Sequence, residues 1–229
     1  MSELVAPIKS VQPATPSTRV VSLDLRGQAF VYEAGQAAMI GLAEREERVP
    51  YSIASAPLET AKTGSLDFLI KIESSGRWGH QFDSLDLGAM VGVRGPFGSF
   101  TLPEEADDTR FLFIAGGTGI APIRAMVREA LLRSGTRKMR LLYSAKTADD
   151  FAYLPELGDM AAREGLDLKL HQTRAATGSS RINLAQLATL VESPETFCFV
   201  CGPESMVADV PPMLLELGID RQRIRVEEW

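Results

Sequence analysis

The chain of 229 residues is poor in the side chains that bind metals. It holds two cysteines and two histidines. An iron–sulfur cluster normally takes four protein ligands, and a zinc site needs closely spaced Cys or His, whereas His80 and His171 lie far apart along the chain. We therefore predict that the chain itself carries no metal site.

The two cysteines are also poor candidates for a redox disulfide. Cys198 and Cys201 have the C-x-x-C spacing, but they lie in or next to an apolar strand pattern at residues 197–200. Residues three apart along a strand face opposite sides of the sheet. We therefore expect the two thiols to stay apart.

Long apolar runs are missing as well. No stretch approaches the roughly 18 residues that a membrane span requires, and the N-terminus lacks the basic start and apolar centre of a signal peptide. These absences predict a protein that does not interact with the membrane and is located in the cytoplasm.

The chain also lacks an excess of positive charge. Its net charge of -6 does not favour nucleic acid as a partner, because nucleic-acid-binding domains usually carry a basic face. The hydrophobic fraction of 45% and the charged fraction of 24% are ordinary for a globular protein. The length allows two domains of about 100 residues each or a single larger one.

The pattern of apolar and polar residues changes near residue 109. The first hundred residues contain short apolar or alternating runs separated by turn signals, which predicts an antiparallel barrel or sandwich. One short helix is expected between Gly76 and Leu87, where the strand pattern lapses. The expected strands are residues 18–25, 37–42, 66–72 and 90–93.

From Thr109 onward strand and helix patterns alternate, which predicts a parallel sheet with helices on both faces. We expect Pro211 to start a new short helix that Gly218 ends. The acidic segment 103–108 is the predicted linker, so the predicted domains are residues 1–103 and 109–229. The expected strands are 111–115, 139–143, 166–171, 197–200 and 224–227, and the expected helices are 120–131, 149–163, 183–191 and one from about 204.

A glycine-rich turn follows the first of these strands. Gly116, Gly117, Thr118 and Gly119 stand where the carboxyl end of a strand meets the amino end of a helix. Free backbone N–H groups and the positive end of the helix dipole suit a diphosphate there. The spacing G-G-T-G matches neither the dinucleotide fingerprint nor a P-loop, so this motif alone leaves a simple tight turn equally open.

Four separated motifs together resemble the ferredoxin–NADP reductase family of flavoproteins. They are Tyr51-Ser-Ile-Ala-Ser55, Gly95-Pro-Phe-Gly98, Gly116-Gly-Thr-Gly-Ile-Ala-Pro122 and Cys201-Gly-Pro203, and their order and distances cover nearly the whole chain. Each motif alone is weak evidence for the family, whereas the four motifs together are specific for it.

The resemblance implies an α/β plus all-β fold: an N-terminal antiparallel six-stranded β-barrel that binds FAD and a C-terminal parallel αβα sheet that binds NADPH or NADH. It implies an enzyme of the ferredoxin–NAD(P)+ reductase type (EC 1.18.1) that moves a hydride from NAD(P)H to the flavin. The electrons then pass to a separate acceptor, a ferredoxin or similar small redox protein. A free-flavin reductase and a non-catalytic nucleotide-binding subunit are the alternatives.

Residues of the flavin site follow from the same resemblance. Tyr51 is expected to pack on the flavin ring and Ser52 to lie beside its N5 atom. The segment from Gly76 matches the flavin-diphosphate segment of the family. The full predicted set is Arg48, Tyr51, Ser52, Ile53, Ala54, Ser55, Gly76, Arg77, Trp78, Gly79 and Trp229.

Two departures from the family pattern leave FAD and FMN both open. The family usually has Arg two residues before the Tyr, where this chain has Val49, and Arg48 lies one position earlier. Such a shift turns a strand side chain to the other face unless a bulge at Val49-Pro50 restores it. Gly79 stands where the family commonly has Ser or Thr.

Residues of the nucleotide site come from the carboxyl ends of the predicted parallel strands. Lys146 follows one strand, and Arg174 and Arg181 follow the next. The resemblance places arginines at such positions near a 2′-phosphate, whose double charge suits a guanidinium group, and this favours NADPH over NADH. The predicted set is Gly116, Gly117, Thr118, Gly119, Ile120, Ser144, Lys146, Arg174, Arg181, Cys201, Gly202, Pro203 and Met206.

Four residues carry the chemistry that the resemblance implies: Ser52, Cys201, Glu227 and Trp229. Cys201 matches a cysteine that positions the nicotinamide. Trp229 matches a terminal aromatic residue that stacks over the flavin and moves aside for the nicotinamide. Glu227 matches an acid near the flavin edge.

Overall fold

A computed structural model describes residues 2–72, 87–103, 109–133, 138–175 and 178–228. The chain divides into two compact units, Met1–Pro103 with Arg124–Leu132, and Glu104–Ile123 with Arg133–Trp229. The helix expected between Gly76 and Leu87 and most of the expected linker lie outside the described residues.

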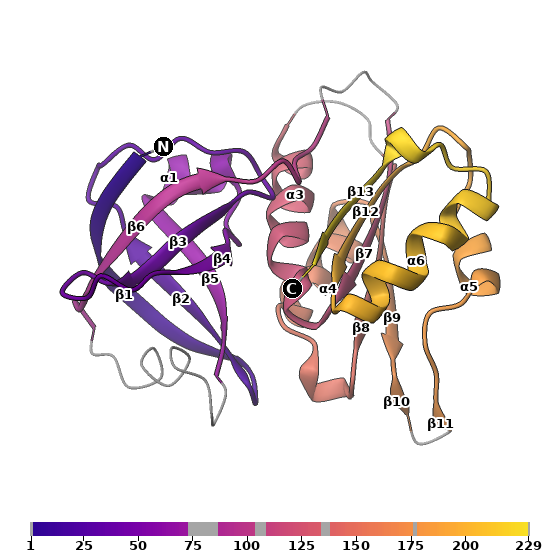
Figure 1. Cartoon of the computed structure of the whole chain (residues 1–229), viewed down its shortest axis with the longest axis horizontal. Coiled ribbons are helices and arrows are strands. Elements are labelled where there is room, and N and C mark those ends of the chain that lie inside the picture. Colours follow the sequence, from indigo (N-terminus) through magenta and orange to yellow (C-terminus); the bar gives the residue numbers. More distant parts are fainter. Residues whose placement is uncertain (1, 73–86, 104–108, 134–137, 176–177, 229) are drawn as a thin grey trace. The chain divides into compact units, whose positions relative to one another are not determined.

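The first unit contains a nearly closed antiparallel barrel of six strands (Figure 1), as predicted. Its ends meet where the Ala54 N–H donates to the Asp67 carbonyl oxygen at 2.8 Å and Ile53 forms a bridge with Phe68. In spatial order the strands are β4 (Val49–Ser52), β3 (Ala37–Leu42), β6 (Met90–Phe97), β1 (Ser2–Thr15), β2 (Thr18–Asp24) and β5 (Ser65–Lys71).

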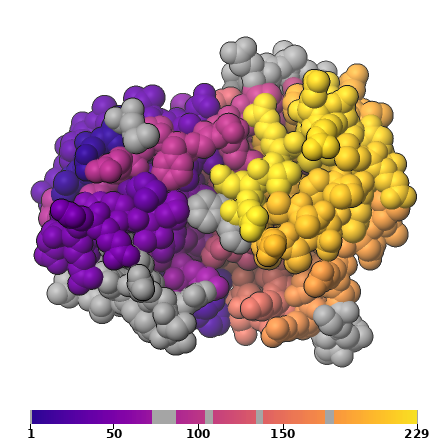
Figure 2. All heavy atoms as spheres, in the orientation of Figure 1, coloured from indigo at the N-terminus to yellow at the C-terminus, as the bar shows by residue number. Residues whose placement is uncertain are grey.

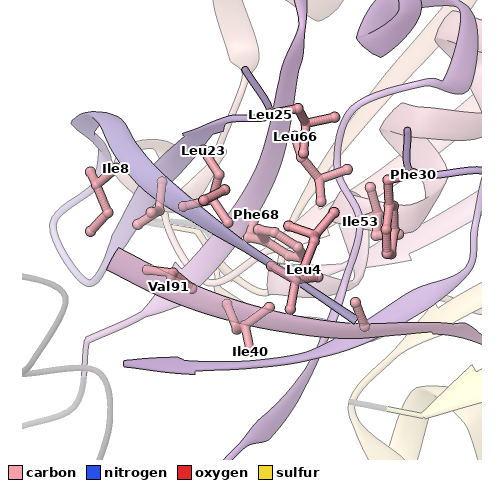
Figure 3. Packing of buried hydrophobic residues seen from close by; sticks show 14 of the residues in the cluster. Leu4, Ile8, Leu23, Leu25, Phe30, Ile40, Ile53, Leu66, Phe68 and Val91 are labelled. Atoms are coloured by element: carbon pink, nitrogen blue, oxygen red, sulfur yellow. The ribbon is translucent and has the colours of Figure 1, made fainter. Parts of the chain in front are cut away.

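Alternate residues of these strands fill the barrel. Figure 3 shows Leu4, Leu23 and Phe68 among the side chains that converge in its interior. All three are buried, and their neighbours along the strands are more exposed. Around Leu4 and Leu23 burial therefore alternates along the strand, as expected for a barrel wall with one buried face.

The strand β1 is not predicted from the sequence because Pro7 interrupts its alternating pattern. Residues 2–7 pair with β6 and residues from Ile8 onward pair with β2, so Pro7 stands where the strand changes partner. A residue without an N–H is tolerated at such a point because the ladder is already interrupted there.

The helix α1 (Pro57–Thr63) connects β4 to β5 and is also not predicted. Pro57 is in its first turn, the Glu59 carboxylate accepts the Ala56 N–H, and Gly64 ends it with φ of 66°. Arg124 of α3 (Ile120–Leu132), in the part of α3 that belongs to the same unit, donates to both Glu59 carboxylate oxygens at 2.8 and 3.0 Å. A buried ion pair therefore anchors the end of α3 to α1.

The second unit contains a five-stranded parallel sheet in the order β13-β12-β7-β8-β9 (Figure 1), as predicted. The strands are β7 (Arg110–Gly116), β8 (Lys138–Ala145), β9 (Leu166–Gln172), β12 (Phe197–Gly202) and β13 (Ile224–Glu228). The helices are α4 (Leu154–Arg163), α5 (Leu184–Ala188) and α6 (Glu204–Glu216). Short 3-10 turns are η1 (Gly117–Gly119), η2 (Ala148–Asp150) and η3 (Arg221–Arg223). A two-stranded ribbon consists of β10 (Arg174–Ala175) and β11 (Gly178–Ser179).

The central strand β7 is apolar throughout because both of its faces are covered. On one face Phe113 stacks with Phe199 of β12, and Phe111 meets the same ring in an edge arrangement. Leu112 and Ile114 join a cluster with residues of α5 and α6 on the other face. A strand buried on two sides reads as a continuous apolar run.

The helix expected over residues 149–163 is wrong at its start. The structure has the turn η2, closed by hydrogen bonds from Thr147 to the Asp150 carboxylate, and α4 then begins at Leu154. Phe151 between them is buried with its ring edge against Tyr143, and Tyr153 has φ of 59°. A helix cannot continue through a residue in the left-handed region.

The expectation that Pro211 starts a new helix is also wrong. A single helix, α6, runs through Pro211 and Pro212 to Glu216. Each proline costs about 3 kcal/mol in a helix interior, but Val210 and Leu214 are buried in the core of the unit, and this packing holds the helix together. Figure 2 shows α6 and β13 as one continuous yellow surface of this unit.

Cys198 and Cys201 are both free thiols, in agreement with their opposite orientation on a strand. Among the described residues, every helix is too short or too polar to cross a lipid bilayer.

Candidate functional site

Two glycines meet at the point where the order of the parallel strands reverses. The chain passes from β7 outward to β8 and β9, then crosses to β12 and β13 on the other side of β7. Gly116 ends β7 and Gly202 ends β12, and a Cβ on Gly202 would lie 3.1 Å from the Gly116 Cα. Ligands of open parallel sheets bind at such a reversal, beyond the carboxyl ends of the strands.

The turn η1 after β7 requires its glycines for two different reasons. Gly117 has φ of 55°, a backbone conformation that L side chains rarely adopt, and faces open space. A Cβ on Gly119 would lie 2.3 Å from the Cys201 carbonyl oxygen, so β12 leaves no room for a side chain. The turn leads directly into α3, whose first N–H groups have no partner within the helix.

A cavity of about 310 Å³ opens beside this turn within the second unit. That volume is at the lower end for small-molecule sites and fits one half of a dinucleotide. It includes eight residues that the sequence predicted for the nucleotide site. The lining residues are Gly116, Gly117, Ser144, Ala145, Lys146, Thr173, Arg174, Ser180, Arg181, Ile182, Pro203, Ser205, Met206, Asp209 and Val210.

Three cationic side chains line one side of the cavity. Lys146 directly follows β8, Arg174 begins β10 just after β9, and Arg181 follows the ribbon of β10 and β11. Asp209 of α6 accepts a hydrogen bond from Arg181 at 3.3 Å. The positive charges exceed the negative ones, so the cavity suits an anionic ligand.

The strand β12 places Cys201 behind the glycine turn. Its side chain is fully buried, and its register partner on β13 is Glu227. Burial, and after it the negative charge of Glu227, raise the pKa of the Cys201 thiol well above its ordinary value. The thiol is therefore neutral at physiological pH and is not activated as a nucleophile.

The end of β4 in the first unit has a buried hydroxyl group that lacks a hydrogen-bond partner. Ser52 is 5% exposed, and its Oγ finds no partner among the described residues. Such a group costs free energy unless a ligand completes its bonding, so this edge of the barrel fits a bound polar ring. Tyr51 beside it is half-buried and packs on the rim of the barrel core.

The next three residues of the predicted flavin stretch face inward. Ile53, Ala54 and Ser55 are buried. The Ala54 carbonyl accepts a hydrogen bond from Arg124 at 2.8 Å, and the Ser55 hydroxyl bonds with Thr60 and the Asp67 N–H. Their side chains stabilise the barrel, and their contact with the flavin stays a prediction.

Arg48 lies where it cannot replace the missing arginine without moving. Its guanidinium donates to the carbonyls of Leu42, Arg45 and Glu47 in the loop before β4. The pairing of β3 with β4 runs through Val49 without a register shift, so no bulge turns Arg48 to the face of Tyr51. Its role toward a flavin diphosphate stays a prediction.

Other predicted site residues are not in the cavity or are not described. Gly119 and Gly202 pack against backbone, and Ile120 is buried in the core. Gly76, Arg77, Trp78, Gly79 and Trp229 lie outside the described residues. Within the described ranges, no three His, Cys, Asp or Glu side chains converge as a metal site would require.

Sequence reasoning misses Ser205, Asp209 and Tyr143. Ser205 and Asp209 are on the helix α6, and they line the cavity because α6 starts directly after Gly202-Pro203. Their position just beyond the Cys-Gly-Pro motif is the signal that points to them. Tyr143 reads as a core residue of β8, and no local signal marks its contact with the turn.

Two known domain families match this chain, one in each half of the sequence. An oxidoreductase FAD-binding domain matches residues 6–102, and an oxidoreductase NAD-binding domain matches residues 113–211. Ferredoxin–NADP reductase B of Sorangium cellulosum is 30% identical over 98% of this chain and 96% of its own length. The chain belongs to the ferredoxin reductase-like family of FAD- and NAD(P)-binding oxidoreductases.

Other members of this family are longer. The reductase component of propane 2-monooxygenase from Mycolicibacterium goodii is 29% identical, and the NADPH oxidoreductase of Mycobacterium tuberculosis is 30% identical. The alignments cover 84% and 89% of this chain but 58% and 53% of those proteins.

Solved structures of the family share the fold. The Amycolatopsis cytochrome P450 reductase GcoB superposes with a TM-score of 0.86 at 26% identity, over 99% of this chain and 69% of that one. A ferredoxin NADP+ reductase from Neisseria gonorrhoeae with bound FAD and NADP gives a TM-score of 0.80 at 22% identity, over 100% and 99% of the two chains. At the latter identity the likeness shows the fold alone.

The family membership makes the chain an NAD(P)H- and FAD-dependent oxidoreductase that passes electrons to an acceptor. The residues fit these cofactors. The barrel has a buried hydroxyl at Ser52 that no described residue contacts by a hydrogen bond, and the parallel sheet has a cationic cavity beside a glycine turn.

Proposed function

We propose that this chain is a reductase that takes electrons from NADPH through FAD and delivers them to a separate redox protein, a ferredoxin or an oxygenase component. The observation that carries the proposal is the alignment over nearly the full length of both chains with ferredoxin–NADP reductase B. The proposal is supported further by the relatives that are reductase components of propane 2-monooxygenases.

The flavin side of the reaction is assigned to the end of β4. Bound FAD accepts a hydride from a reduced nicotinamide and releases its electrons singly or in pairs. The ring of Tyr51 would pack against the flavin, and the Ser52 hydroxyl would hydrogen-bond to a polar atom at its edge. The Oγ of Ser52 has no hydrogen-bond partner within the described part of the chain. This supports the assignment, because a bound ring would supply the missing bond.

The nucleotide side is assigned to the carboxyl edge of the parallel sheet. The N–H groups of the turn η1 would bind the diphosphate at the positive end of α3, and Gly117 lets it approach the backbone. Cys201 would position the nicotinamide as a neutral, buried side chain. Glu227, its register partner, would supply a negative charge near the reacting rings.

The preference for NADPH rests on Lys146, Arg174 and Arg181. All three line the cavity, which Gly116 and Gly117 of the glycine turn also line. A 2′-phosphate would displace Asp209 from Arg181, since a dianion competes well with a single carboxylate for a guanidinium group. NADH would gain none of these contacts.

Stopped-flow reduction with NADH and NADPH side by side tests the proposal. We expect a yellow protein whose flavin spectrum bleaches faster with NADPH than with NADH. The change Arg181→Ala should raise the KM for NADPH about tenfold and leave that for NADH unchanged, because one charge-assisted contact contributes roughly 1.5–3 kcal/mol. A colourless protein that FAD cannot reconstitute would exclude the proposed function.

A second measurement separates delivery to a protein from release of flavin. We expect FAD to co-elute with the protein in gel filtration and NADPH oxidation to accelerate when a ferredoxin is added. Oxidation that requires added free flavin and ignores ferredoxin would favour a free-flavin reductase.

A further inference from the structure

The buried hydroxyl of Tyr143 is bonded to the glycine turn. Tyr143 lies on β8, opposite Ala115 of β7 in the parallel register, and its side chain is fully buried. Its hydroxyl donates to the Gly117 carbonyl oxygen at 3.2 Å and accepts from the Ala152 N–H at 3.1 Å. Because an amide N–H can only donate, the single phenolic proton is available for Gly117.

The tyrosine ring is held from a second direction. Phe151 packs its edge against the Tyr143 ring, with centroids 5.0 Å apart and planes at 82°. Phe151 and Ala152 lie in the break between η2 and α4, where the sequence pattern predicts a continuous helix. The break directs the Ala152 N–H to Tyr143 and away from the ladder of a helix.

Holding the Gly117 carbonyl also orients the next N–H group. In a trans peptide the carbonyl of Gly117 and the N–H of Thr118 point in opposite directions. The carbonyl faces inward to Tyr143 and also accepts the Ile120 N–H at the start of α3. Because a glycine restricts its own backbone little, the orientation of this peptide depends on these two hydrogen bonds, and Tyr143 supplies one of them.

We propose that Tyr143 is a positioning residue of the pyridine-nucleotide site: it holds the Gly117–Thr118 peptide so that the Thr118 N–H faces the diphosphate. This inference rests on the nucleotide site assigned under the proposed function. Burial raises the pKa of Tyr143 far above its ordinary value, so the hydroxyl keeps the proton that it donates at any pH at which the protein is folded.

The diphosphate is common to NADH and NADPH, and this fact separates Tyr143 from the residues that select between them. Tyr143→Phe keeps the ring but removes two hydrogen bonds, the one to the Gly117 carbonyl and the one from the Ala152 N–H. We expect the dissociation constants of both nucleotides to rise about tenfold, since one hydrogen bond to a charged group is worth roughly that much. Arg181→Ala should weaken NADPH alone.

Tyr32→Phe is a matched control in the other unit. The Tyr32 hydroxyl is also buried and bonds with the Ser55 carbonyl and the Thr60 hydroxyl. Its loss should lower the melting temperature and leave nucleotide affinity unchanged. Phe151→Leu, which loosens the Tyr143 ring and keeps its hydroxyl, should weaken both nucleotides by a smaller factor in the same direction.

The experiment is titration of the FAD-loaded protein with NADP+ and NAD+, together with the KM of NADPH and NADH, for the wild type and these variants. Parallel weakening of both nucleotides in Tyr143→Phe, with a smaller effect in Phe151→Leu, supports the inference. Unchanged affinities in a folded Tyr143→Phe protein would overturn it while leaving the proposed function intact. A wild-type protein that binds neither nucleotide would overturn both together.

Discussion

At the scale of single residues, the hydroxyl of Ser52 and the thiol of Cys201 are the two buried groups that the proposed function assigns to the cofactors. Ser52 has a buried oxygen without a partner among the described residues, and Cys201 is buried beside the carboxylate of Glu227. Neither arrangement stabilises the fold by itself. Each becomes reasonable if a cofactor covers it.

For Ser52 we expect Ser52→Ala to slow flavin reduction about 10- to 100-fold, because a hydrogen-bond donor beside the reacting atom is lost. The melting temperature of the FAD-free protein should stay the same or rise, since an unpartnered buried hydroxyl is removed. Stopped-flow reduction and thermal melts measure the two effects.

Ser55→Ala is the matched control for that change. The Ser55 hydroxyl is bonded to Thr60 and to the Asp67 N–H, so its removal should lower the melting temperature. Equal destabilisation by Ser52→Ala and Ser55→Ala would contradict the assignment of Ser52 to the cofactor.

For Cys201 we expect Cys201→Ala to slow reduction about tenfold with the flavin still bound, because a misplaced nicotinamide loses alignment with its acceptor. Cys198→Ala should leave the rate unchanged, since Cys198 lies on the face covered by α5 and α6. Loss of flavin from the Cys201→Ala protein would show that we have assigned Cys201 to the wrong site.

The pH dependence of the wild-type rate provides a second check on Cys201. Because its thiol pKa is raised, the rate should not increase between about pH 7 and 9, where an ordinary thiol ionises. A rise that disappears in Cys201→Ala would show that the thiolate takes part in the reaction.

At the scale of elements, the ion pair between Glu59 of α1 and Arg124 of α3 links two helices within the first unit. Arg124 and Glu59 are 7% and 19% exposed in their side chains and are joined by two hydrogen bonds. Removing one partner leaves the other charge buried, so Arg124→Met should lower the free energy of unfolding by about 3 kcal/mol. Urea denaturation measures this change.

The same pair predicts a loss of stability in acid. Burial by itself would raise the pKa of Glu59, but the hydrogen bonds and charge of Arg124 outweigh it and lower the pKa. A carboxyl with a lowered folded-state pKa stabilises the protein above its unfolded pKa of about 4.3 and loses that contribution as the pH falls through the folded value. Wild type and Glu59→Gln should therefore differ in stability at neutral pH and converge in acid.

The exposed pair of Arg94 and Glu3 is the control for both experiments. Its side chains are 54% and 58% exposed, with a distance of 3.3 Å. Glu3→Gln should change stability by no more than about 1 kcal/mol. If it destabilised the protein as much as Glu59→Gln, burial would not be the cause.

At the scale of the whole molecule, the chain separates two binding tasks into two units of different architecture. The barrel matches the FAD-binding model and the parallel sheet matches the NAD-binding model, in that order along the chain. Hydride transfer requires the two cofactors to meet, so residues that regulate access of the nicotinamide to the flavin belong to this scale. The family resemblance assigns that task to Trp229.

Removing Trp229 should tighten binding of oxidised nucleotide about tenfold and slow turnover. The reason is that the nicotinamide would no longer compete with the indole for the flavin, and product release would become slower. Trp229→Phe, which keeps an aromatic ring, should have an intermediate effect. Titration with NADP+ and steady-state rates measure both, and unchanged values in the truncated protein would exclude the stacking role.

The sequence by itself determined the family, the two architectures and most of the strands, but not β1 or α1. Alternation in the barrel strands and the continuous apolar run of β7 reflect local burial patterns that are visible along the chain. The strand β1 escaped this reading because a proline interrupts its pattern, and α6 was misread because packing of Val210 and Leu214 overrides helix propensity.

Only the tertiary structure decided which side chains complete the site. Asp209 and Arg181 are 28 residues apart in sequence, and Tyr143 and Gly117 are 26 apart. They meet because parallel pairing brings the carboxyl ends of strands distant in sequence to one edge of the sheet. The glycine turn is visible in the sequence, whereas the hydroxyl that orients it depends on which strand lies beside it.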